Sequence, residues 1–431
     1  MDYAAALAYL DEHSNYEKTG RINSPTIERV ERLLGAMGDP QLSCPSIHIT
    51  GTNGKGSTAQ MITRLLMAHG LTVGTYSSPH VDKINERMTV DGESISDDEF
   101  ADAIGAVADL EIVMGVRPTF FEAVTAAAFR WFSDIAVDVM VVEVGLLGRW
   151  DATNAVQPEV CVVTNVGLDH AEYAGPTLAD IAREKAGIVK PDATLVLGVT
   201  DPDLAAIFAE AGPAKLLRRD VDFGLNLNET ALGGRMLDIY TPQAVYGDVF
   251  ISLHGAHQGE NASLAVAAVE AFFDAPIATD VLAEGLASVR MPARFEVLGH
   301  QPLVIIDGAH NPHGADRCAE VFFSDFDPAG RRLLVIGCLE GRDIEALLGA
   351  LRADEFDTVF CCTAPSPRGV PVAQLAASAR AIGCETVYAY DTVLDACSAA
   401  MRAADSDDAV LVAGSLYVVG EARGILLRLI P

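Results

Sequence analysis

The sequence predicts an α/β fold with two domains, a larger N-terminal domain built on a mostly parallel sheet and a smaller, Rossmann-like C-terminal domain. Three observations predict this class. The chain has 431 residues, which is too many for one ordinary core and enough for two. Half of the residues are hydrophobic, so disorder and low-complexity classes do not fit. Short β-branched runs alternate with helical segments, which is typical of parallel sheets.

The composition narrows the choice of partners and compartment. The 60 acidic and 30 basic residues give a formal charge of −30, which repels nucleic acid and anionic lipid. The apolar runs are shorter than the roughly 18 residues that span a bilayer, and the acidic start of the chain is unlike a signal peptide. The eight cysteines form no CxxC pair, so zinc and redox motifs are unsupported. We therefore expect a cytoplasmic monomer that acts on small molecules, without nucleic acid or membrane as a partner.

The N-terminal domain is predicted to open with helices. Ser24-Pro25 offers a capping serine followed by proline at the first helical position, and the apolar face that follows begins at Ile27. Four strands are then predicted, at Ser46–Thr50, Leu71–Tyr76, Val137–Val144 and Val160–Val166. From about residue 193 to residue 253, recurring glycines predict a meander. Helical periodicity returns in Asn261–Phe273 and Asp280–Ser288.

A second α/β series begins near Met291. Its five predicted strands are Leu303–Asp307, Arg332–Gly337, Thr358–Thr363, Thr386–Tyr390 and Ala409–Gly414. Five strands are enough for a separate sheet of ordinary size. We therefore place the domain boundary near residue 295, which gives domains of residues 1–295 and 296–431.

A glycine-rich loop follows the first predicted strand. The loop Gly51–Ser57 leads into a helix predicted at Thr58–His69. Glycines let backbone N–H groups face one point, the helix dipole favours an anion, and Lys55 can reach outer phosphates while Ser57 faces Mg²⁺. The loop departs from the usual P-loop spacing, because Gly56 separates Lys55 from Ser57. The alternative is a tight strand–helix turn with a solvated lysine.

Candidate metal ligands lie at strand ends. Glu143 ends one predicted strand, His170 lies just past the next, and Ser57 and Ser78 follow two others. Because the carboxyl ends of parallel strands share one edge, these side chains are expected to meet there, and hard oxygen ligands suit Mg²⁺. Taken alone, Glu143 is equally explained as a capping or paired carboxylate. Lys185, in a predicted helix at residues 178–189, is explained without function as a solvent-facing lysine.

Many short motifs occur in a defined order between about residues 20 and 315, and together they resemble the folylpolyglutamate synthase and dihydrofolate synthase family, relatives of the Mur ligases. The motifs are Gly51–Ser57, Tyr76–His80, Asn85–Arg87, Thr119–Glu122, Glu143–Leu146, Arg149–Asn154, Leu168–His170, Arg183–Ile188, His257-Gln258 with Asn261, Pro292–Glu296 and Asp307–Pro312. The resemblance implies a P-loop-type ATPase domain followed by a glutamate ligase domain. It also implies ATP-dependent attachment of glutamate to a folate or pteroate carboxylate through an acyl phosphate.

The resemblance also implies roles for individual residues. ATP is expected at Thr52, Asn53, Gly54, Lys55, Gly56, Ser57, Asn261, Arg294 and Asp307. Two Mg²⁺ ions are expected at Ser57, Ser78, Glu143, His170 and Lys185, with Lys185 carrying a carbamate. The folate or pteroate is expected at Thr119, Phe120, Phe121, Glu122, Arg149 and Asp151. Lys55, Lys185 and His310 are expected to act in catalysis, and ATP is expected between the two domains.

Three alternatives remain open at this stage: a Mur-type ligase acting on a nucleotide-linked cell-wall precursor, a P-loop NTPase or small-molecule kinase, and a nucleotide-binding scaffold without chemistry. One residue departs from the family pattern, because Leu147 stands where a glycine is usual. If the position needs a positive φ, a leucine costs about 1–2 kcal/mol, whereas an ordinary backbone region accommodates it; in either case we expect Leu147 to be compatible with catalysis. Ser24-Pro25-Thr26 also replaces the Asp-Leu-Gly of many bifunctional members, so the sequence leaves open which of the two activities is present.

Overall fold

The computed structural model describes residues 1–19, 25–169 and 171–430. The chain forms two compact units, and each is described by itself. Unit 1 comprises Met1–Ser252 with Gln258–Val289, and unit 2 comprises Leu253–His257 with Arg290–Pro431. The second stretch of unit 2 begins a few residues before the predicted boundary at 295. Among the described residues, no helix is both long and apolar enough to cross a membrane.

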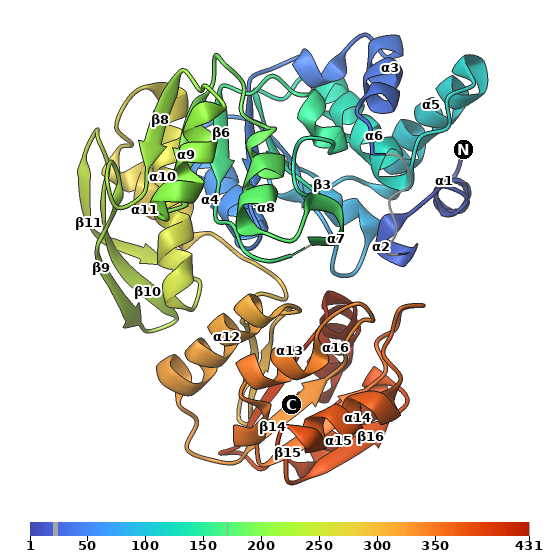
Figure 1. The fold of residues 1–431 in the computed structure, drawn as a ribbon, viewed down its shortest axis with the longest axis vertical. Coiled ribbons are helices and arrows are strands. Elements are labelled where there is room, and N and C mark those ends of the chain that lie inside the picture. The colour runs from blue at the N-terminus through green and yellow to red at the C-terminus, as the bar shows by residue number, and fades with distance from the viewer. Residues whose placement is uncertain (20–24, 170, 431) are drawn as a thin grey trace. The chain divides into compact units, whose positions relative to one another are not determined.

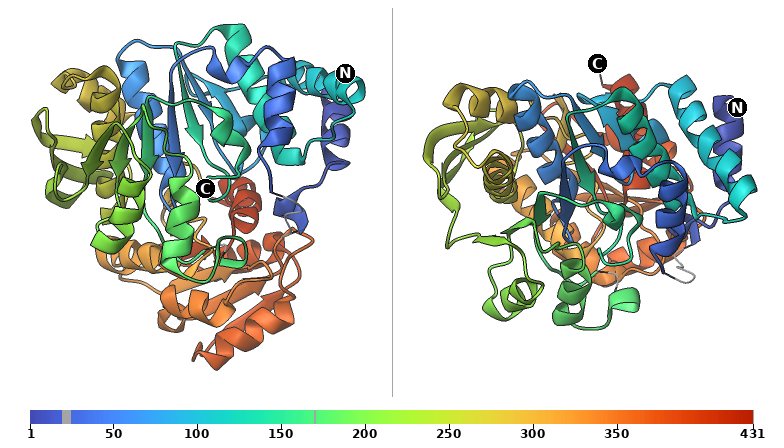
Figure 2. Two further views of the ribbon diagram at one scale, coloured as in Figure 1. Left: turned by 45° about the horizontal axis from the view of Figure 1, so that its top comes forward. Right: turned by 90° about the horizontal axis from the view of Figure 1, so that it is seen from above.

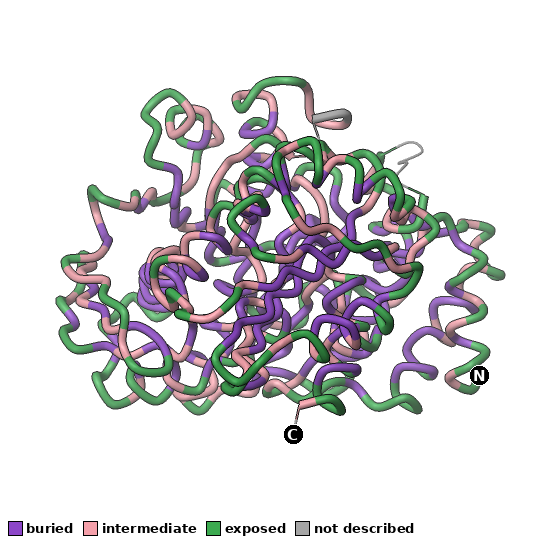
Figure 3. Tube along the Cα trace, turned by 90° about the horizontal axis from the view of Figure 1, so that it is seen from below, coloured by how far each residue is buried: buried purple, intermediate pink, exposed green. Residues whose placement is uncertain are grey.

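Unit 1 is built on a sheet that has eight strands within the described residues, in the order β4-β3-β2-β5-β1-β6-β7-β8. The parallel strands are β1 (Ser46–Thr50), β2 (Val73–Tyr76), β5 (Val139–Glu143), β6 (Val160–Val163), β7 (Thr194–Leu197) and β8 (Lys215–Arg218). Two short antiparallel strands, β3 (Met88–Val90) and β4 (Glu93–Ser94), extend one edge. The central strands β1, β5 and β6 are buried along their whole length, as Figure 3 shows, and this explains the apolar runs of β5 and β6.

Helices cover both faces of this sheet (Figures 1 and 2). The hydroxyl of Thr75 in β2 lies 2.7 Å from that of Thr63 in α4 (Lys55–Ala68). Gly74, the preceding residue, faces the ring of Phe132 in α6 (Phe120–Ile135). Because successive strand residues point to opposite faces, α4 and α6 cover opposite sides. The buried cluster on the α6 side also takes in α1 (Tyr3–Asp11), α3 (Glu28–Ala36) and α5 (Asp97–Met114).

The remaining elements of unit 1, within the described residues, are six further α-helices and a second, smaller sheet. The helices are α2 (Tyr16–Thr19), α7 (Ala171–Ala174), α8 (Leu178–Ala186), α9 (Pro202–Glu210), α10 (Ala256–Phe273) and α11 (Thr279–Ala287). Helix α2 lies near β3, where Glu17 bonds to Arg87. The smaller sheet is antiparallel, in the order β11-β10-β9, and consists of β9 (Gly224–Ala231), β10 (Gly234–Tyr240) and β11 (Val245–Ile251).

Unit 2 has one sheet in the order β12-β13-β17-β14-β15-β16. Its strands are β12 (Glu296–His300), β13 (Leu303–Ile306), β14 (Arg332–Ile336), β15 (Thr358–Cys362), β16 (Val387–Tyr390) and β17 (Ala409–Ala413). Only β12 pairs antiparallel within this sheet. The helices around it are α12 (Pro312–Glu320), α13 (Ile344–Ala350), α14 (Val372–Ala381), α15 (Val393–Ala403) and α16 (Leu416–Leu429).

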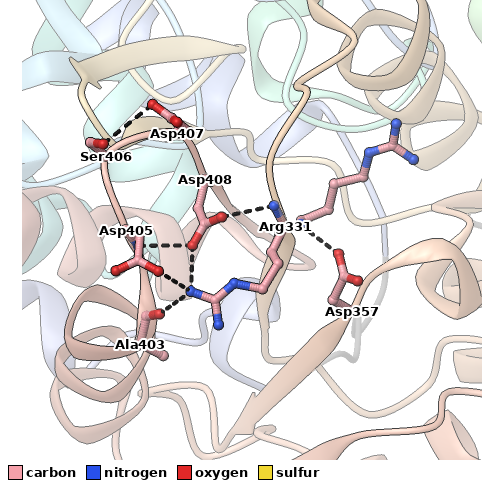
Figure 4. Close-up of polar contacts among 8 residues, drawn as sticks. Arg331, Asp357, Ala403, Asp405, Ser406, Asp407 and Asp408 are labelled. Atoms are coloured by element: carbon pink, nitrogen blue, oxygen red, sulfur yellow. Dashed lines mark hydrogen bonds and ion pairs between the residues drawn. The ribbon is translucent and has the colours of Figure 1, made fainter.

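An ion-pair cluster ties together the amino ends of β14 and β17 (Figure 4). The Arg331 guanidinium donates from Nη2 to Asp408 Oδ2 at 2.7 Å, to Asp405 Oδ2 at 3.0 Å and to Ala403 O at 2.8 Å. The backbone N–H of Arg331 donates to Asp408 Oδ1 at 2.8 Å. The Asp408 carboxylate is buried, but these donors stabilise its charge and hold its pKa below the ordinary value. The cluster therefore secures the edge of the sheet opposite to Asp307.

The structure confirms the predicted α/β class and corrects three details. The helix predicted at Ser24-Pro25 begins at Glu28, and Ser24 lies outside the described residues. The meander predicted from residue 193 begins only at Gly224, because β7 and β8 extend the parallel sheet and α9 connects them. The second sheet has six strands in the described part of the chain rather than five, since β12 was not predicted.

Candidate active site

Four loops leave adjacent strands at the carboxyl edge of the unit 1 sheet. β1 leads into Gly51–Ser57, β2 into Ser77–His80 and β6 into Thr164-Asn165, while β5 ends at Glu143. These strands are neighbours, in the order β2-β5-β1-β6, and β1 is the point from which the connections run to either side. Ligands of parallel α/β sheets bind outside the carboxyl ends of the strands at such a point.

The phosphate-loop segment requires glycine for steric reasons. Gly54 has a φ of +82°, and a Cβ there would lie 2.5 Å from Asn261 Oδ1. Gly51 approaches the Thr164 hydroxyl so closely that it leaves no room for a Cβ. Helix α4 begins at Lys55, directly after Gly54, so its first N–H groups face the loop. The helix predicted at Thr58 therefore begins three residues earlier.

Contacts with the loop backbone and with its surroundings hold the side chains of this loop in place. Lys55 Nζ donates to Gly51 O at 3.1 Å and to Thr52 O at 3.3 Å, so the ammonium curls over the loop. Ser57 is buried in the first turn of α4. Asn261, on α10, donates from Nδ2 to Gln258 Oε1 at 3.0 Å and touches the loop at Gly54. The structure thus brings together the unit 1 residues for which ATP contacts were predicted.

Two residues that sequence reasoning missed clamp the same loop. Asn165 Oδ1 accepts from the Asn53 amide at 3.0 Å, and Asn165 Nδ2 donates to Asn53 O at 3.0 Å. The Thr164 hydroxyl donates to the same Asn53 carbonyl at 2.6 Å. Their position directly after β6, at the edge that carries the other loops, was the signal that could have found them.

Ser78 and Glu143, two predicted magnesium ligands, meet at this edge. The backbone N–H of Ser78 donates to Glu143 Oε2 at 3.2 Å, and Glu143 is 4 % exposed. A buried carboxylate requires hydrogen bonds or a cation to offset its desolvation. His170, the third predicted ligand, lies outside the described residues. No cluster of three or more His, Cys, Asp or Glu side chains suited to a metal occurs among the residues that are described.

Lys185 is buried, which excludes the solvent-facing interpretation of this lysine. Its side chain belongs to α8 and the residue is 3 % exposed. Burial and then the positive charge of Lys55 lower the pKa of the Lys185 amine, Asp169 opposes both effects, and the resulting pKa is about 7. The amine is therefore neutral in a large fraction of molecules at physiological pH.

The loop that follows Glu143 has an unusual backbone at Leu147. Its φ is +56°, so of the two cases left open by the sequence the strained one applies, and the leucine carries the strain that glycine avoids. The Thr50 hydroxyl donates to Leu147 O. A Cβ on Gly148 would lie 3.1 Å from Lys185 O, so the loop packs closely against α8.

The Asp151 carboxylate accepts hydrogen bonds from the same loop and from Thr153. Oδ2 accepts from the Leu146 amide at 2.8 Å, and the Gly145 amide also donates to this carboxylate. Oδ1 accepts from the Thr153 amide at 3.0 Å and from the Thr153 hydroxyl at 2.6 Å. Burial raises the pKa of Asp151, and these four donors oppose that rise.

The segment Thr119–Glu122 forms a capping box at the start of α6. Thr119 Oγ1 accepts from the Glu122 amide at 3.2 Å, and Glu122 Oε2 accepts from the Thr119 amide at 2.8 Å. Arg29 holds the Glu122 carboxylate from Nε and Nη2, at 3.1 and 2.9 Å. This frame places the Phe121 ring against Gly145 and 6.0 Å from the Tyr76 ring. Arg149 is exposed, and its amide donates to Glu184 O at 3.0 Å.

A second unpredicted contact anchors the Ser77–His80 loop. Arg87 is fully buried, and its guanidinium donates to both carboxylate oxygens of Glu17, at 2.9 and 2.6 Å. Its Nε donates to His80 Nδ1 at 2.9 Å, and its plane lies over the Phe120 ring. Burial, followed by the Arg87 charge, lowers the pKa of His80 to about 4.

In unit 2 the predicted residues gather after β13. Asp307 accepts from the Phe295 amide and the Ala309 amide, both at 2.7 Å. Burial raises the pKa of this carboxyl group, and Arg294 opposes the rise. Phe295, beside Arg294, has a φ of +44°, so Asp307 holds a strained turn. His310 Nδ1 donates to Gly308 O at 2.9 Å, since a carbonyl can only accept, and Nε2 is then the ring nitrogen that accepts a proton.

Comparison with known proteins supports the family resemblance seen in the sequence motifs. Residues 49–269 match the Mur ligase middle domain, and residues 293–416 match the Mur ligase glutamate ligase domain. A Mycobacterium tuberculosis protein named dihydrofolate synthase/folylpolyglutamate synthase is 36 % identical, over 94 % of this chain and 90 % of that protein. A Halobacterium salinarum protein named probable bifunctional folylpolyglutamate synthase/dihydropteroate synthase is 39 % identical over 93 % of this chain, which spans about half (49 %) of that protein.

Solved structures of similar proteins extend over nearly the whole chain. M. tuberculosis folylpolyglutamate synthase, complexed with ADP and AMPPCP, has a TM-score of 0.90 at 34 % identity, covering 98 % of this chain and 99 % of that one. E. coli FolC in complex with DHPP and ADP has a TM-score of 0.89 at 30 % identity, covering 99 % and 98 %. A bifunctional folylpolyglutamate synthase/dihydrofolate synthase with Mn, AMPPNP and L-glutamate bound has a TM-score of 0.86 at 30 % identity, covering 99 % and 98 %.

Proposed function

The chain belongs to the Mur ligase family, in its folylpolyglutamate synthase and dihydrofolate synthase branch, and on this premise we propose that it joins L-glutamate to the carboxylate of dihydropteroate or of a folate. It is an ATP-dependent ligase that forms an amide bond. The complexes of its relatives with ADP, with DHPP and with L-glutamate support one substrate each. The observation that carries the proposal is the strand order, which sets the glycine loop beside Ser78, Glu143 and Lys185.

The phosphates of ATP are proposed to bind at the glycine loop of unit 1. The backbone N–H groups of Thr52–Ser57 and the start of α4 supply donors, and Lys55 supplies the positive charge. Asn261, which touches Gly54, is a further proposed contact. Arg294 and Asp307 are proposed to contact the nucleotide from unit 2.

The donor set at the edge of the sheet fits magnesium. The serine hydroxyls of Ser57 and Ser78 and the carboxylate of Glu143, which is buried at the edge of the sheet, are hard oxygen ligands of the kind that magnesium prefers. We propose that these groups, with His170 and a carbamate on Lys185, hold two Mg²⁺ ions. When bound, the metal neutralises charge on the phosphate oxygens.

The carbamate on Lys185 is supported by the state of its amine. A neutral amine adds to CO₂ through its nitrogen lone pair, loses one proton, and becomes an N-carboxylate with one negative charge. Lys185 is buried, beside the Lys55 charge, with a pKa lowered to about 7, and these are the conditions in which the neutral amine is present. The modification would replace a cation by an anion where metal and phosphate bind.

The reaction is proposed to proceed in two steps. An oxygen of the acceptor carboxylate attacks the γ-phosphorus of ATP, the bond to the ADP oxygen breaks, and an acyl phosphate forms. Lys55 stabilises charge on the transferred oxygens. The amine of glutamate then attacks the acyl carbon, phosphate leaves, and the amine loses its proton. His310 is proposed as the acceptor of this proton, since its Nδ1 is held by Gly308 O and Nε2 can accept.

The acceptor is proposed to lie against the loop after Glu143 and the start of α6. Phe120 and Phe121 offer aromatic surface, Thr119 and Glu122 fix the helix start that presents them, and Arg149 and Asp151 belong to the adjoining loop. We propose that the protein works as a cytoplasmic monomer, and light scattering at assay concentrations tests the oligomeric state.

The proposal is tested by incubating the protein with ATP, Mg²⁺, L-glutamate and either dihydropteroate or tetrahydrofolate. A ligase yields a new amide, detected by mass spectrometry, and an equal amount of ADP. A kinase yields a phosphorylated acceptor without amide, and a scaffold binds ATP without turnover. Formation of ADP with neither amide overturns the proposal, and the ratio of the two amides identifies the main acceptor.

A further inference from the structure

His48 lies in the middle of β1, with its imidazole fully buried, and the glycine loop begins three residues later at Gly51. Its neighbours Ile47 and Ile49 are also fully buried, and their side chains point to the opposite face of the sheet. His48 Nδ1 is buried without a hydrogen-bond partner among the described residues. An unpaired buried nitrogen costs free energy that an apolar residue would avoid. Packing alone therefore does not explain a histidine at this position.

The other ring nitrogen makes a directed hydrogen bond. His48 Nε2 lies 2.9 Å from Thr153 Oγ1, across 105 residues of sequence. Thr153 Oγ1 has one proton, and it points to the Asp151 carboxylate at 2.6 Å. The hydroxyl must therefore accept from the histidine, so Nε2 carries the proton and Nδ1 does not. Burial and the Lys190 charge lower the pKa of His48 to about 3, so the ring stays neutral.

The hydrogen bonds from His48 through Thr153 to Asp151 form a relay, and this relay ends at the loop after Glu143. The ionised Asp151 carboxylate accepts the amides of Gly145 and Leu146, the two residues before the strained Leu147. The Thr50 hydroxyl holds the carbonyl of Leu147 from β1. Two anchors from the same strand thus fix this loop, one direct and one through three side chains.

We propose that His48 is a positioning residue for acceptor binding, which acts through Thr153 and Asp151 to hold the Gly145–Arg149 loop beside Glu143. The neutral ring with its proton on Nε2 sets the direction of every hydrogen bond in the relay. The inference rests on the proposed function for what the loop binds, but the relay itself can be measured without turnover.

The kinetic test compares His48→Leu, which fills the space without a donor, with His48→Gln, which keeps a neutral donor at a similar reach. His48→Leu should lower kcat/KM for dihydropteroate about tenfold, which corresponds to about 1.4 kcal/mol, mainly through KM. The KM for ATP should stay within about twofold of the wild-type value. His48→Gln should recover most of the loss. Tyr246→Phe is the matched control, because it removes a buried hydrogen bond to Glu270 elsewhere in unit 1.

A second pair of variants covers the case in which His48→Leu does not fold. Thr153→Val removes the central hydroxyl and should reproduce the dihydropteroate defect, whereas Thr153→Ser keeps the hydroxyl and should not. Equal acceptor kinetics in the Thr153→Val and Thr153→Ser variants, or a dihydropteroate defect of the same size in Tyr246→Phe, overturns the inference.

Two measurements are independent of catalysis. In protein labelled with ¹⁵N-histidine, His48 should show a protonated Nε2 and a bare Nδ1, and a protonated Nδ1 contradicts the relay. Hydrogen exchange at the Leu146 amide should accelerate about tenfold or more in Thr153→Val and not in Tyr246→Phe. If wild-type protein forms no amide, the proposed function fails while these two results still decide the relay.

Discussion

Replacement of His48 by glutamine should make unit 1 more resistant to acid than the wild type. In the folded chain, burial lowers the pKa of His48 to about 3, whereas an unfolded chain has the ordinary value of 6.5. Below pH 6.5 the His48 imidazole therefore binds a proton in the unfolded state but not in the folded state, and the wild type loses stability as the pH falls. At pH 5 this loss is about 2 kcal/mol, and it is negligible at pH 7.5. His48→Gln removes the term and leaves all other titrating groups in place.

The assay is urea denaturation at pH 7.5 and pH 5, followed by tryptophan fluorescence. Both tryptophans of the chain, Trp131 and Trp150, lie in unit 1, so the signal reports the unit that contains His48. The free energy of unfolding of the wild type should fall about 2 kcal/mol more than that of His48→Gln between the two pH values. Parallel losses in both proteins would refute the conclusion that the folded chain keeps His48 neutral.

Four further substitutions test other parts of the structure. Lys55→Ala should abolish amide formation and leave the urea transition unchanged, because the ammonium contacts only the loop, and near-normal activity would remove it from the phosphate site. Lys185→Ala should be inactive and partly restored by added short carboxylic acids, and a mass spectrum of native wild-type protein without CO₂ adduct would count against the carbamate. Leu147→Gly should be tolerated, since it relieves about 1 kcal/mol of backbone strain. It should also raise kcat/KM for tetrahydrofolate relative to that for dihydropteroate. An unchanged ratio would show that Leu147 strains the backbone without affecting the choice of acceptor. Asp408→Ala should lower the stability of unit 2 by about 2–3 kcal/mol in urea denaturation followed by circular dichroism, because three donors lose a buried charged partner, and a loss below about 0.5 kcal/mol would contradict that reasoning.

The sequence predicted the parts of the fold that depend on local pattern. The buried strands β5, β6 and β17 are apolar runs, and those runs are visible without a structure. The strands that were missed or misplaced are short or half-exposed. β12 is exposed or half-buried at most positions and β4 is wholly exposed, so neither has an apolar run to mark it.

Some contacts of the candidate site could likewise be predicted from local sequence, and others could not. Strand ends and glycine loops are local features, so the meeting of Ser78 with Glu143 could be predicted from parallel topology. The bonds of His48 to Thr153 and of Arg87 to Glu17 join residues 105 and 70 positions apart, and no pattern in either segment announces them. The positive φ of Leu147 could not be decided from the sequence, because tertiary contacts rather than residue type impose the conformation.

The two-step chemistry is tested most directly by the fate of the acceptor oxygen. Dihydropteroate carrying oxygen-18 in its carboxylate is incubated with ATP, Mg²⁺, L-glutamate and the protein, and the released phosphate is analysed by mass spectrometry. If the reaction passes through an acyl phosphate, each amide formed is accompanied by one phosphate that carries one labelled oxygen. The Lys55→Ala variant should form neither the amide nor the labelled phosphate. Unlabelled phosphate accompanying the amide would contradict the account.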